Sequence, residues 1–131
     1  MDKSKIVEYW KEYSGRDMAV AEDLFNSKKY SYSLFFCHLS LEKLLKSFIV
    51  EYTGAPAPLG HGLVKLAELA GFRLTDREID LLSEITTFNL KSRYDDYKLN
   101  FYKKATRGYA TRYFKITKDL IIWLKKNYQP K

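Results

Sequence analysis

Tyr30-Ser-Tyr-Ser-Leu-Phe-Phe-Cys-His-Leu-Ser-Leu-Glu-Lys-Leu-Leu-Lys46 begins a helix that the sequence predicts over residues 30–52. Apolar residues cover most of the circumference of this helix, which is typical of a helix buried at the centre of a fold. We therefore expect the other elements of the chain to pack around it. Its predicted core residues are Leu34, Phe35, Cys37, Leu41, Leu44, Leu45, Phe48 and Ile49.

The segment before this central helix also has helical spacing of its apolar residues. It predicts a first helix over residues 5–28, with a kink at Ser14-Gly15. The glycines and prolines of residues 54–60 are expected to end the central helix. The residues expected to face the core from the first helix are Ile6, Tyr9, Trp10, Tyr13, Met18, Ala21, Leu24 and Phe25.

Three more helices are expected after residue 60. A short one follows His61 and stops at Gly71, and the capping box Thr75-Asp-Arg-Glu78 opens the next, which runs toward Leu90. The last is expected over residues 102–127. The chain has no strand-like alternation of useful length. The sequence therefore predicts an all-α, up-and-down bundle of about five helices in one domain over residues 1–131.

The composition limits the class of protein. Hydrophobic residues make up 46% of the 131 residues, which is enough for a folded core and argues against a disordered chain. Cys37 is the only cysteine, so no intramolecular disulfide can form and a reducing compartment is expected. No apolar run approaches the roughly 18 residues that span a bilayer. We therefore expect a cytoplasmic protein that does not enter a membrane.

Charge is distributed unevenly along the chain. Residues 1–97 contain 13 Lys and Arg against 15 Asp and Glu, a formal charge of −2. Residues 98–131 contain 10 Lys and Arg against a single acid, a formal charge of +9. Basic charge clustered on one element favours a polyanionic partner such as nucleic acid. Many small basic proteins bind nothing acidic, and this alternative stays open.

The predicted last helix separates apolar and basic side chains on opposite faces at 100° per residue. A solvated surface face is the simpler interpretation. Asp119 is the only acid near the basic face, however, and this favours a surface that contacts phosphates. The apolar face carries Tyr102, Tyr109, Tyr113, Ile116, Leu120 and Leu124. The residues predicted for the polyanion surface are Lys104, Arg107, Lys115 and Lys118, with Lys125 and Lys126 beyond them.

Three polar residues interrupt the central helix at i, i+4 and i+8. This spacing stacks His38, Glu42 and Lys46 on one side of the helix. In one interpretation Glu42 and Lys46 simply satisfy each other at the edge of the bundle. In the other the three residues mark a binding site or an interface, because buried charges cost stability unless they are paired. Both interpretations stay open.

A polar and aromatic patch, Asn89-Leu-Lys-Ser-Arg-Tyr-Asp-Asp-Tyr97, lies at the charge boundary and is expected as a loop or a frayed helix end. Its Arg93 is suited to an anionic ligand, whereas Asp95 and Asp96 are expected to pair with nearby cations rather than bind Mg²⁺. His61 is expected to be a cap or loop residue. The two histidines and one cysteine lack ligand-like spacing, so we expect no metal and no cofactor.

Three of these segments together resemble the HEPN domain family. The central helix, with Glu42-Lys-Leu-Leu-Lys46, resembles the signature helix of that family. Residues 58–66, Pro-Leu-Gly-His-Gly-Leu-Val-Lys-Leu, are similar to the element that opens its third helix. Ser92-Arg-Tyr-Asp95 is similar to the segment before its last helix. The motifs follow in the family's order over about residues 19–124.

The resemblance implies a bundle like the C-terminal domain of kanamycin nucleotidyltransferase, often dimeric and often working beside a small nucleotidyltransferase. Several members are metal-independent ribonucleases, including toxins of toxin–antitoxin pairs, with a motif of Arg, four to six residues and then His. Arg93 matches the arginine, but residues 98–100 are Lys, Leu and Asn where the histidine would fall. Acid–base cleavage needs a group that titrates near neutral pH. Tyr97 or His38 could substitute in principle.

The leading interpretation is a dimeric companion of a small nucleotidyltransferase that binds nucleotide or RNA without catalysis of its own. One alternative is a metal-independent ribonuclease with an altered motif. Another is a pure protein-interaction module whose patch makes only dimer contacts. No residue is assigned as catalytic, although Arg93 is a candidate. The residues predicted to bind the ligand are Arg93, Tyr94, Asp95, Tyr97, His38, Glu42 and Lys46.

Overall fold

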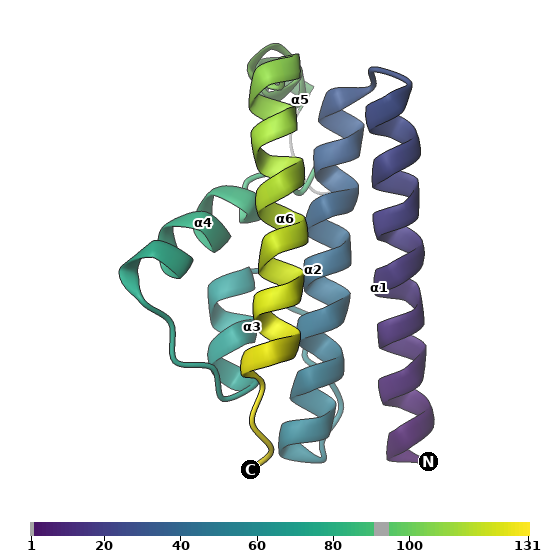
Figure 1. The fold of residues 1–131 in the computed structure, drawn as a ribbon, viewed down its shortest axis with the longest axis vertical. Coiled ribbons are helices and arrows are strands. Elements are labelled where there is room, and N and C mark those ends of the chain that lie inside the picture. The colour runs from purple at the N-terminus through teal and green to yellow at the C-terminus, as the bar shows by residue number, and fades with distance from the viewer. Residues whose placement is uncertain (1, 91–94) are drawn as a thin grey trace.

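The structure is a computed structural model that describes residues 2–90 and 95–131. These residues form six helices and no strand, which confirms the predicted all-α class. Figure 1 shows three long helices, α1, α2 and α6, standing side by side, with the shorter α3 and α4 at one edge and α5 at one end. The helices are α1 (Lys3–Asn26), α2 (Tyr30–Thr53), α3 (Leu63–Leu69), α4 (Asp76–Thr86), α5 (Asp95–Lys104) and α6 (Arg107–Asn127).

The second helix, α2, is the central element of the bundle, as its sequence predicts. It contacts each of the other five described helices. Leu34, Leu41 and Leu45 are fully buried along it. The helix ends where Gly54 adopts a left-handed conformation with φ of 72° and its N–H donates to the carbonyl oxygen of Val50. Glycine is favoured at this position because it has no Cβ to clash.

The first helix packs on α2 through small polar side chains, which corrects the predicted core face. The hydroxyl of Ser14 donates to the carbonyl oxygen of Ser40 at 2.8 Å. In return, the hydroxyl of Ser40 donates to the carbonyl oxygen of Ser14 at 2.9 Å. Small side chains let two helices approach closely, and the reciprocal bonds satisfy the buried hydroxyls. Tyr9, predicted to face the core, is 52% exposed. The helix is continuous through Gly15.

The capping box at the start of α4 is confirmed. The side chain of Thr75 accepts from the N–H of Glu78, and the side chain of Glu78 accepts from the N–H of Thr75. The helix ends at Thr86, before the predicted end near Leu90.

The predicted last helix is in fact two helices, which is the main correction to the predicted fold. Residues 95–104 form α5 and residues 107–127 form α6. Thr106 separates them, because its side chain accepts from the N–H of Tyr109 and caps α6. Tyr102 therefore lies on α5, where it is 65% exposed, and not on the apolar face of α6. None of the described helices is both long enough and apolar enough to cross a membrane.

Candidate functional site

The polar residues of α2 form a connected network inside the bundle. Glu42 and Lys46 are both 5% exposed, and His38 is completely buried. The ammonium of Lys46 donates to Oε2 of Glu42 at 3.1 Å and lies 5.6 Å from the centre of the Trp10 ring. The i, i+4, i+8 spacing thus brings the three side chains together as predicted, and the charge of Glu42 is compensated within the fold.

His61 completes this network from outside the helix, which the sequence did not predict. Its Nδ1 lies 3.0 Å from Oε1 of Glu42, and its backbone oxygen accepts from Nε2 of His38 at 3.2 Å. The ring is 52% exposed, so one side of it is buried against Glu42 and the other meets solvent. We call Glu42, Lys46, His38 and His61 the Glu42 network.

His38 is held neutral at the base of the Glu42 network. Burial lowers the pKa of His38 below its ordinary value of 6.5, although the neighbouring carboxylate of Glu42 opposes this shift. Its Nε2 is the donor to the His61 carbonyl, and its Nδ1 is buried without a hydrogen-bond partner among the described residues. A neutral, enclosed imidazole can support the loop above it, but it cannot reach a ligand in solvent.

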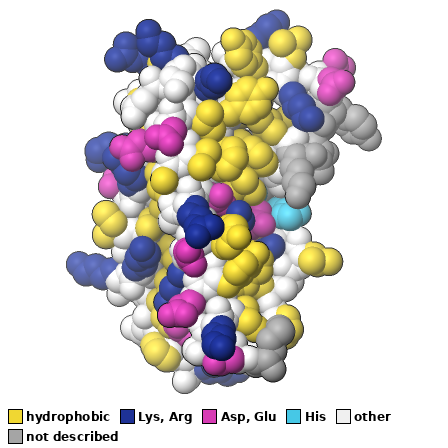
Figure 2. Space-filling view, turned by 90° about the vertical axis from the view of Figure 1, so that its right-hand side faces the viewer, with side chains coloured by type: hydrophobic (Ala, Val, Ile, Leu, Met, Phe, Trp, Pro, Cys, Tyr) yellow, Lys and Arg dark blue, Asp and Glu magenta, His cyan; other side chains and the backbone are white. Residues whose placement is uncertain are grey.

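An open cavity of about 740 Å³ lies along α2 beside the Glu42 network. Its size falls in the range of small-molecule sites, and most of its walls are aromatic or aliphatic. Figure 2 shows a band of hydrophobic side chains on the side of the molecule next to α1, interrupted near its middle and flanked by charged groups. We call this cavity the α2 cleft. Its lining residues are Trp10, Ser31, Tyr32, Phe35, Phe36, Leu39, Glu42, Lys43, His61, Asn89, Leu90, Lys98 and Tyr102.

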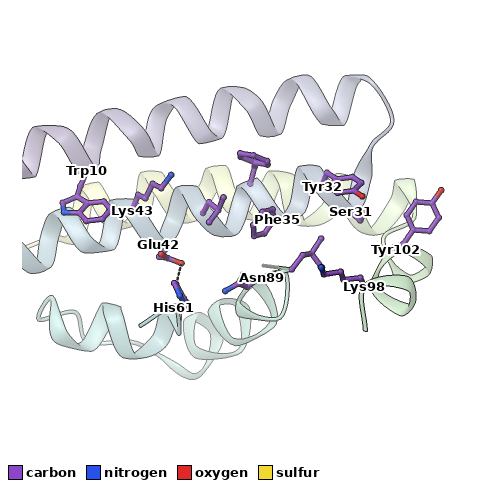
Figure 3. A pocket seen from close by; sticks show the side chains of 13 residues that line it. Trp10, Ser31, Tyr32, Phe35, Glu42, Lys43, His61, Asn89, Lys98 and Tyr102 are labelled. Carbon is purple, nitrogen blue, oxygen red and sulfur yellow. Dashed lines mark hydrogen bonds and ion pairs between the residues drawn. The ribbon is translucent and has the colours of Figure 1, made fainter. Parts of the chain in front are cut away.

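The α2 cleft brings together segments that are far apart in the sequence. Figure 3 shows Trp10 reaching in from α1, Tyr102 and Lys98 from α5, and Glu42 pointing toward His61. Lys43 is engaged at the cleft wall, because its ammonium lies 2.6 Å from Oδ2 of Asp17. Lys98 is exposed and forms no ion pair with a described residue. It is therefore the cation of the cleft that is available to a ligand.

The patch predicted around Arg93 is only partly described. Arg93 and Tyr94 lie outside the described residues. Asp95 is exposed in the first turn of α5, where a carboxylate interacts favourably with the helix dipole. The hydroxyl of Tyr97 donates to the carbonyl oxygen of Thr87 at 2.5 Å, which ties α5 to the end of α4.

The carboxylate of Glu84 fastens α5 to the bundle. It accepts from the ammonium of Lys104 at 2.8 Å and from the hydroxyl of Tyr109 through a short hydrogen bond. Burial alone would raise the pKa of Glu84, but the hydrogen bonds from Lys104 and Tyr109 outweigh it and lower that pKa. Burial and the same carboxylate raise the pKa of Tyr109. Lys104, predicted as part of a polyanion surface, thus has a structural partner.

The other residues predicted for the polyanion surface differ in the contacts that their side chains make. Lys115 lies 3.2 Å from Oδ2 of Asp119, one turn along α6. Lys118 covers the ring of Phe114, with its ammonium 4.9 Å from the ring centre. Arg107 is exposed in the first turn of α6 and has no ion pair among the described residues. Arg107 and Lys118 are therefore the members of this set that remain free of acidic partners within the described chain.

Two other kinds of chemistry receive no support from the described residues. Across residues 2–90 and 95–131, no group of three or more His, Cys, Asp and Glu side chains is placed to hold a metal ion. Burial raises the pKa of the Cys37 thiol to about 12, so this cysteine is a poor nucleophile near neutral pH.

Comparison with known proteins gives one finding. The family model described as HEPN domain matches residues 7–127, which is nearly the whole chain and wider than the resemblance seen in the motifs. No curated protein and no solved structure matches the chain. The match agrees with the helical bundle of the structure, and it supports a nucleotide- or RNA-related function at the level of the family.

Proposed function

The chain belongs to the HEPN domain family, and on this premise we propose that it binds nucleotide or RNA as the dimeric companion of a small nucleotidyltransferase. Arg93 remains a predicted phosphate ligand. The Arg-to-His ribonuclease motif lacks its histidine at residues 98–100, so we expect no catalysis through that motif.

The α2 cleft is the observation that carries this proposal. Tyr32, Phe35 and Tyr102 line it, and bases stack on aromatic rings with little preference for sequence. Lys98 also lines the cleft, and its ammonium is suited to hold a phosphate. Tyr32 and Tyr102 are 56% and 65% exposed, so their rings are open to a ligand.

The first test measures binding of labelled single-stranded RNA and of ATP by fluorescence anisotropy at low salt. Tyr102→Ala is expected to weaken RNA binding about tenfold, because one stacking contact contributes about 1–3 kcal/mol. Tyr9→Ala is the matched control, since Tyr9 is also an exposed tyrosine but does not line the cleft. Failure of the wild type to bind either ligand would remove the proposal.

The basic surface of α6 is tested by the salt dependence of the same binding. If Arg107 and Lys118 contact phosphates, the double reversal Arg107→Glu/Lys118→Glu is expected to flatten the slope of log affinity against log salt by about 1.5. Lys3→Glu/Lys5→Glu changes the net charge equally in the first turn of α1 and serves as the control. Equal slopes for the two variants would show that RNA does not contact Arg107 and Lys118 on α6.

The dimer is proposed to form along the hydrophobic band at the edge of the α2 cleft, so that the two clefts lie side by side and stay open to RNA. Sedimentation velocity is expected to show a dimer that Tyr32→Glu dissociates. Ile122→Glu on α6 is the control, because Ile122 is 65% exposed but lies outside the cleft. If the protein is only a protein-interaction module, Tyr32→Glu would still dissociate the dimer, but neither the wild type nor the variant would bind RNA. Co-purification with a small nucleotidyltransferase encoded beside it tests the remaining partner.

A further inference from the structure

One stripe of the central helix α2 is left uncovered by the described helices. Tyr32 is 56% exposed, and Phe35, Phe36 and Leu39 are only half-buried. These residues recur at i, i+3, i+4 and i+7, which is the spacing of a helix face that packs against another helix. All four line the α2 cleft. The bundle of described helices therefore has room for one more neighbour on this side of α2.

The stripe is the floor of a groove. Figure 3 shows α1 along one side of α2 and the shorter elements along the other. Trp10 projects from α1 near one end of the groove, and Lys98 and Tyr102 stand at the other end. Between Tyr32 and Lys43 the floor extends about 17 Å, at about 1.5 Å per residue. A floor of this length matches about three turns of a docked helix.

The charges of the groove are balanced except at one point. The ammonium of Lys43 lies 2.6 Å from Oδ2 of Asp17, and Glu42 is compensated within its own network. Lys98 is the lining cation that forms no ion pair with a described residue. The groove is therefore complementary to a ligand with a long apolar face and a negative charge at the Lys98 end.

A nucleic acid strand suits only the Lys98 end of this groove. Every nucleotide carries a phosphate, whereas Trp10, Phe36 and Leu39 lie in a part of the groove whose lining cation, Lys43, is already paired. Burial of a phosphate against apolar side chains without a cation is costly. The apolar face of an amphipathic helix buries the same surface without that cost, as in other complexes where a helix binds in a groove.

We propose that the α2 cleft receives an amphipathic helix of a partner protein. Its apolar side chains pack on the α2 stripe, and an acidic residue of its first turn pairs with Lys98. A carboxylate in the first turn is also favoured by the helix dipole, so the N-terminus of the docked helix lies at the Lys98 end. The helix covers Phe35 and Tyr102, the rings proposed to stack on bases, and thereby excludes RNA. This exclusion rests on the proposed function, whereas the docking does not.

Docking is measured without RNA, by fluorescence anisotropy of a labelled peptide of about 16 residues, a length that can populate a helix. Its leucines are spaced i, i+3, i+4, i+7 and i+11, and two glutamates lie in its first turn. Alanine and glutamine fill the other positions. The control peptide has the same composition but distributes the leucines around the whole helix, and we expect it to bind at least tenfold more weakly.

Charge reversal locates the docked helix. Lys98→Glu is expected to weaken peptide binding about fivefold, because a repulsion replaces an attraction between exposed groups. A peptide with two lysines in place of the glutamates is expected to recover the affinity for this variant. Lys98 is exposed, so its reversal leaves the core of the fold intact.

Truncation of the floor tests the apolar contact. Phe36→Ala is expected to weaken peptide binding about tenfold. Ile122→Ala is the matched control, because Ile122 is 65% exposed but lies outside the cleft. Urea denaturation of each variant shows that it is folded. Peptide affinity that neither Lys98→Glu nor Phe36→Ala changes would place the helix elsewhere and overturn this inference.

Three further outcomes separate this inference from its alternatives. A peptide that separates the dimer into monomers in sedimentation velocity overturns it, because a second copy of the chain then fills the groove. The peptide is expected to displace labelled RNA, and simultaneous binding of the two overturns the exclusion. RNA binding without peptide binding overturns this inference and leaves the proposed function intact, whereas peptide binding without RNA or ATP binding does the reverse.

Discussion

Glu42–Lys46 on α2 and Lys115–Asp119 on α6 are ion pairs of the same spacing and nearly the same length, 3.1 Å and 3.2 Å. Their surroundings differ. The side chains of the first pair are each 7% exposed, whereas those of the second are 77% and 62% exposed. Water and salt screen the exposed pair, while the buried pair has only protein groups to replace its lost hydration.

The difference shows why one charged region is suited to a site and the other to a surface. A buried carboxylate keeps its partners in fixed positions, because releasing any of them leaves a charge without compensation. Glu42 therefore holds both Lys46 and His61. The cations of α6 can exchange an acid for a phosphate at little cost, which is the behaviour expected of a polyanion-binding face.

The largest expected effect is the loss of the buried carboxylate. Glu42→Ala leaves the ammonium of Lys46 buried without an acceptor, and we expect it to lower the free energy of unfolding by about 3–5 kcal/mol. Urea denaturation measures this loss. The double variant Glu42→Leu/Lys46→Leu is expected to recover much of the loss, because it removes the uncompensated charge. A cost for Glu42→Ala below about 1 kcal/mol would mean that the pair is solvated.

The next effect concerns pH and the neutral His38. Its pKa is lower in the folded protein than the ordinary value of 6.5, so the folded state binds fewer protons than the unfolded state below that pH. The stability that His38 contributes is therefore present above about pH 6.5 and lost as pH falls through its lower folded pKa. Glu42, Lys46 and His61 are the charged or titratable groups next to it.

Thermal denaturation of the wild type and His38→Gln between pH 7.5 and 5.5, about one unit either side of that ordinary value, tests this expectation. The wild type is expected to lose more stability than the variant over this range, because glutamine does not titrate but can still donate to the His61 carbonyl. Parallel pH profiles would show that His38 accepts a proton without cost in the fold.

Contacts between residues close together in the sequence could be predicted from it, whereas contacts between distant residues could not. The His38–Glu42–Lys46 stack depends only on helical spacing, which the sequence contains. His61 meets Glu42 across 19 residues, along a loop path that local patterns do not encode. Thr106 is a single capping residue without the acidic partner of a capping box. The sequence therefore contained little indication that one helix ends and another begins between α5 and α6.

The first helix was misjudged for a related reason. Ser14 and Asp17 are absent from the predicted core face, yet both are buried against α2. Reciprocal serine bonds and the ion pair from Lys43 to Asp17 compensate them. Polarity predicts exposure only where no partner is available, and the partners here belong to another helix.

An intermediate effect is expected at Glu84, which lies between the two extremes with a side chain 29% exposed. Glu84→Ala removes the acceptor of Lys104 and Tyr109, and we expect a loss of about 2 kcal/mol. Because these bonds fasten α5, amide hydrogen exchange is expected to increase in residues 95–104 more than in α2. Glu84→Gln is the control that keeps an acceptor for Tyr109. Uniform exchange changes across the chain would mean that α5 is held by other contacts.

The smallest effect is expected for the exposed pair, and it decides whether the comparison holds. A double-mutant cycle of Lys115→Ala and Asp119→Ala should give a coupling of about 0.3–0.5 kcal/mol at low salt, typical of an exposed i,i+4 pair. At about 1 M salt the Debye length falls to roughly 3 Å, and this coupling is expected to vanish. The same cycle on Glu42 and Lys46 is expected to keep most of its coupling at that salt. If both couplings fell together, the buried pair would be reached by solvent ions, and the fixed orientation of His61 by Glu42 would lose its physical basis.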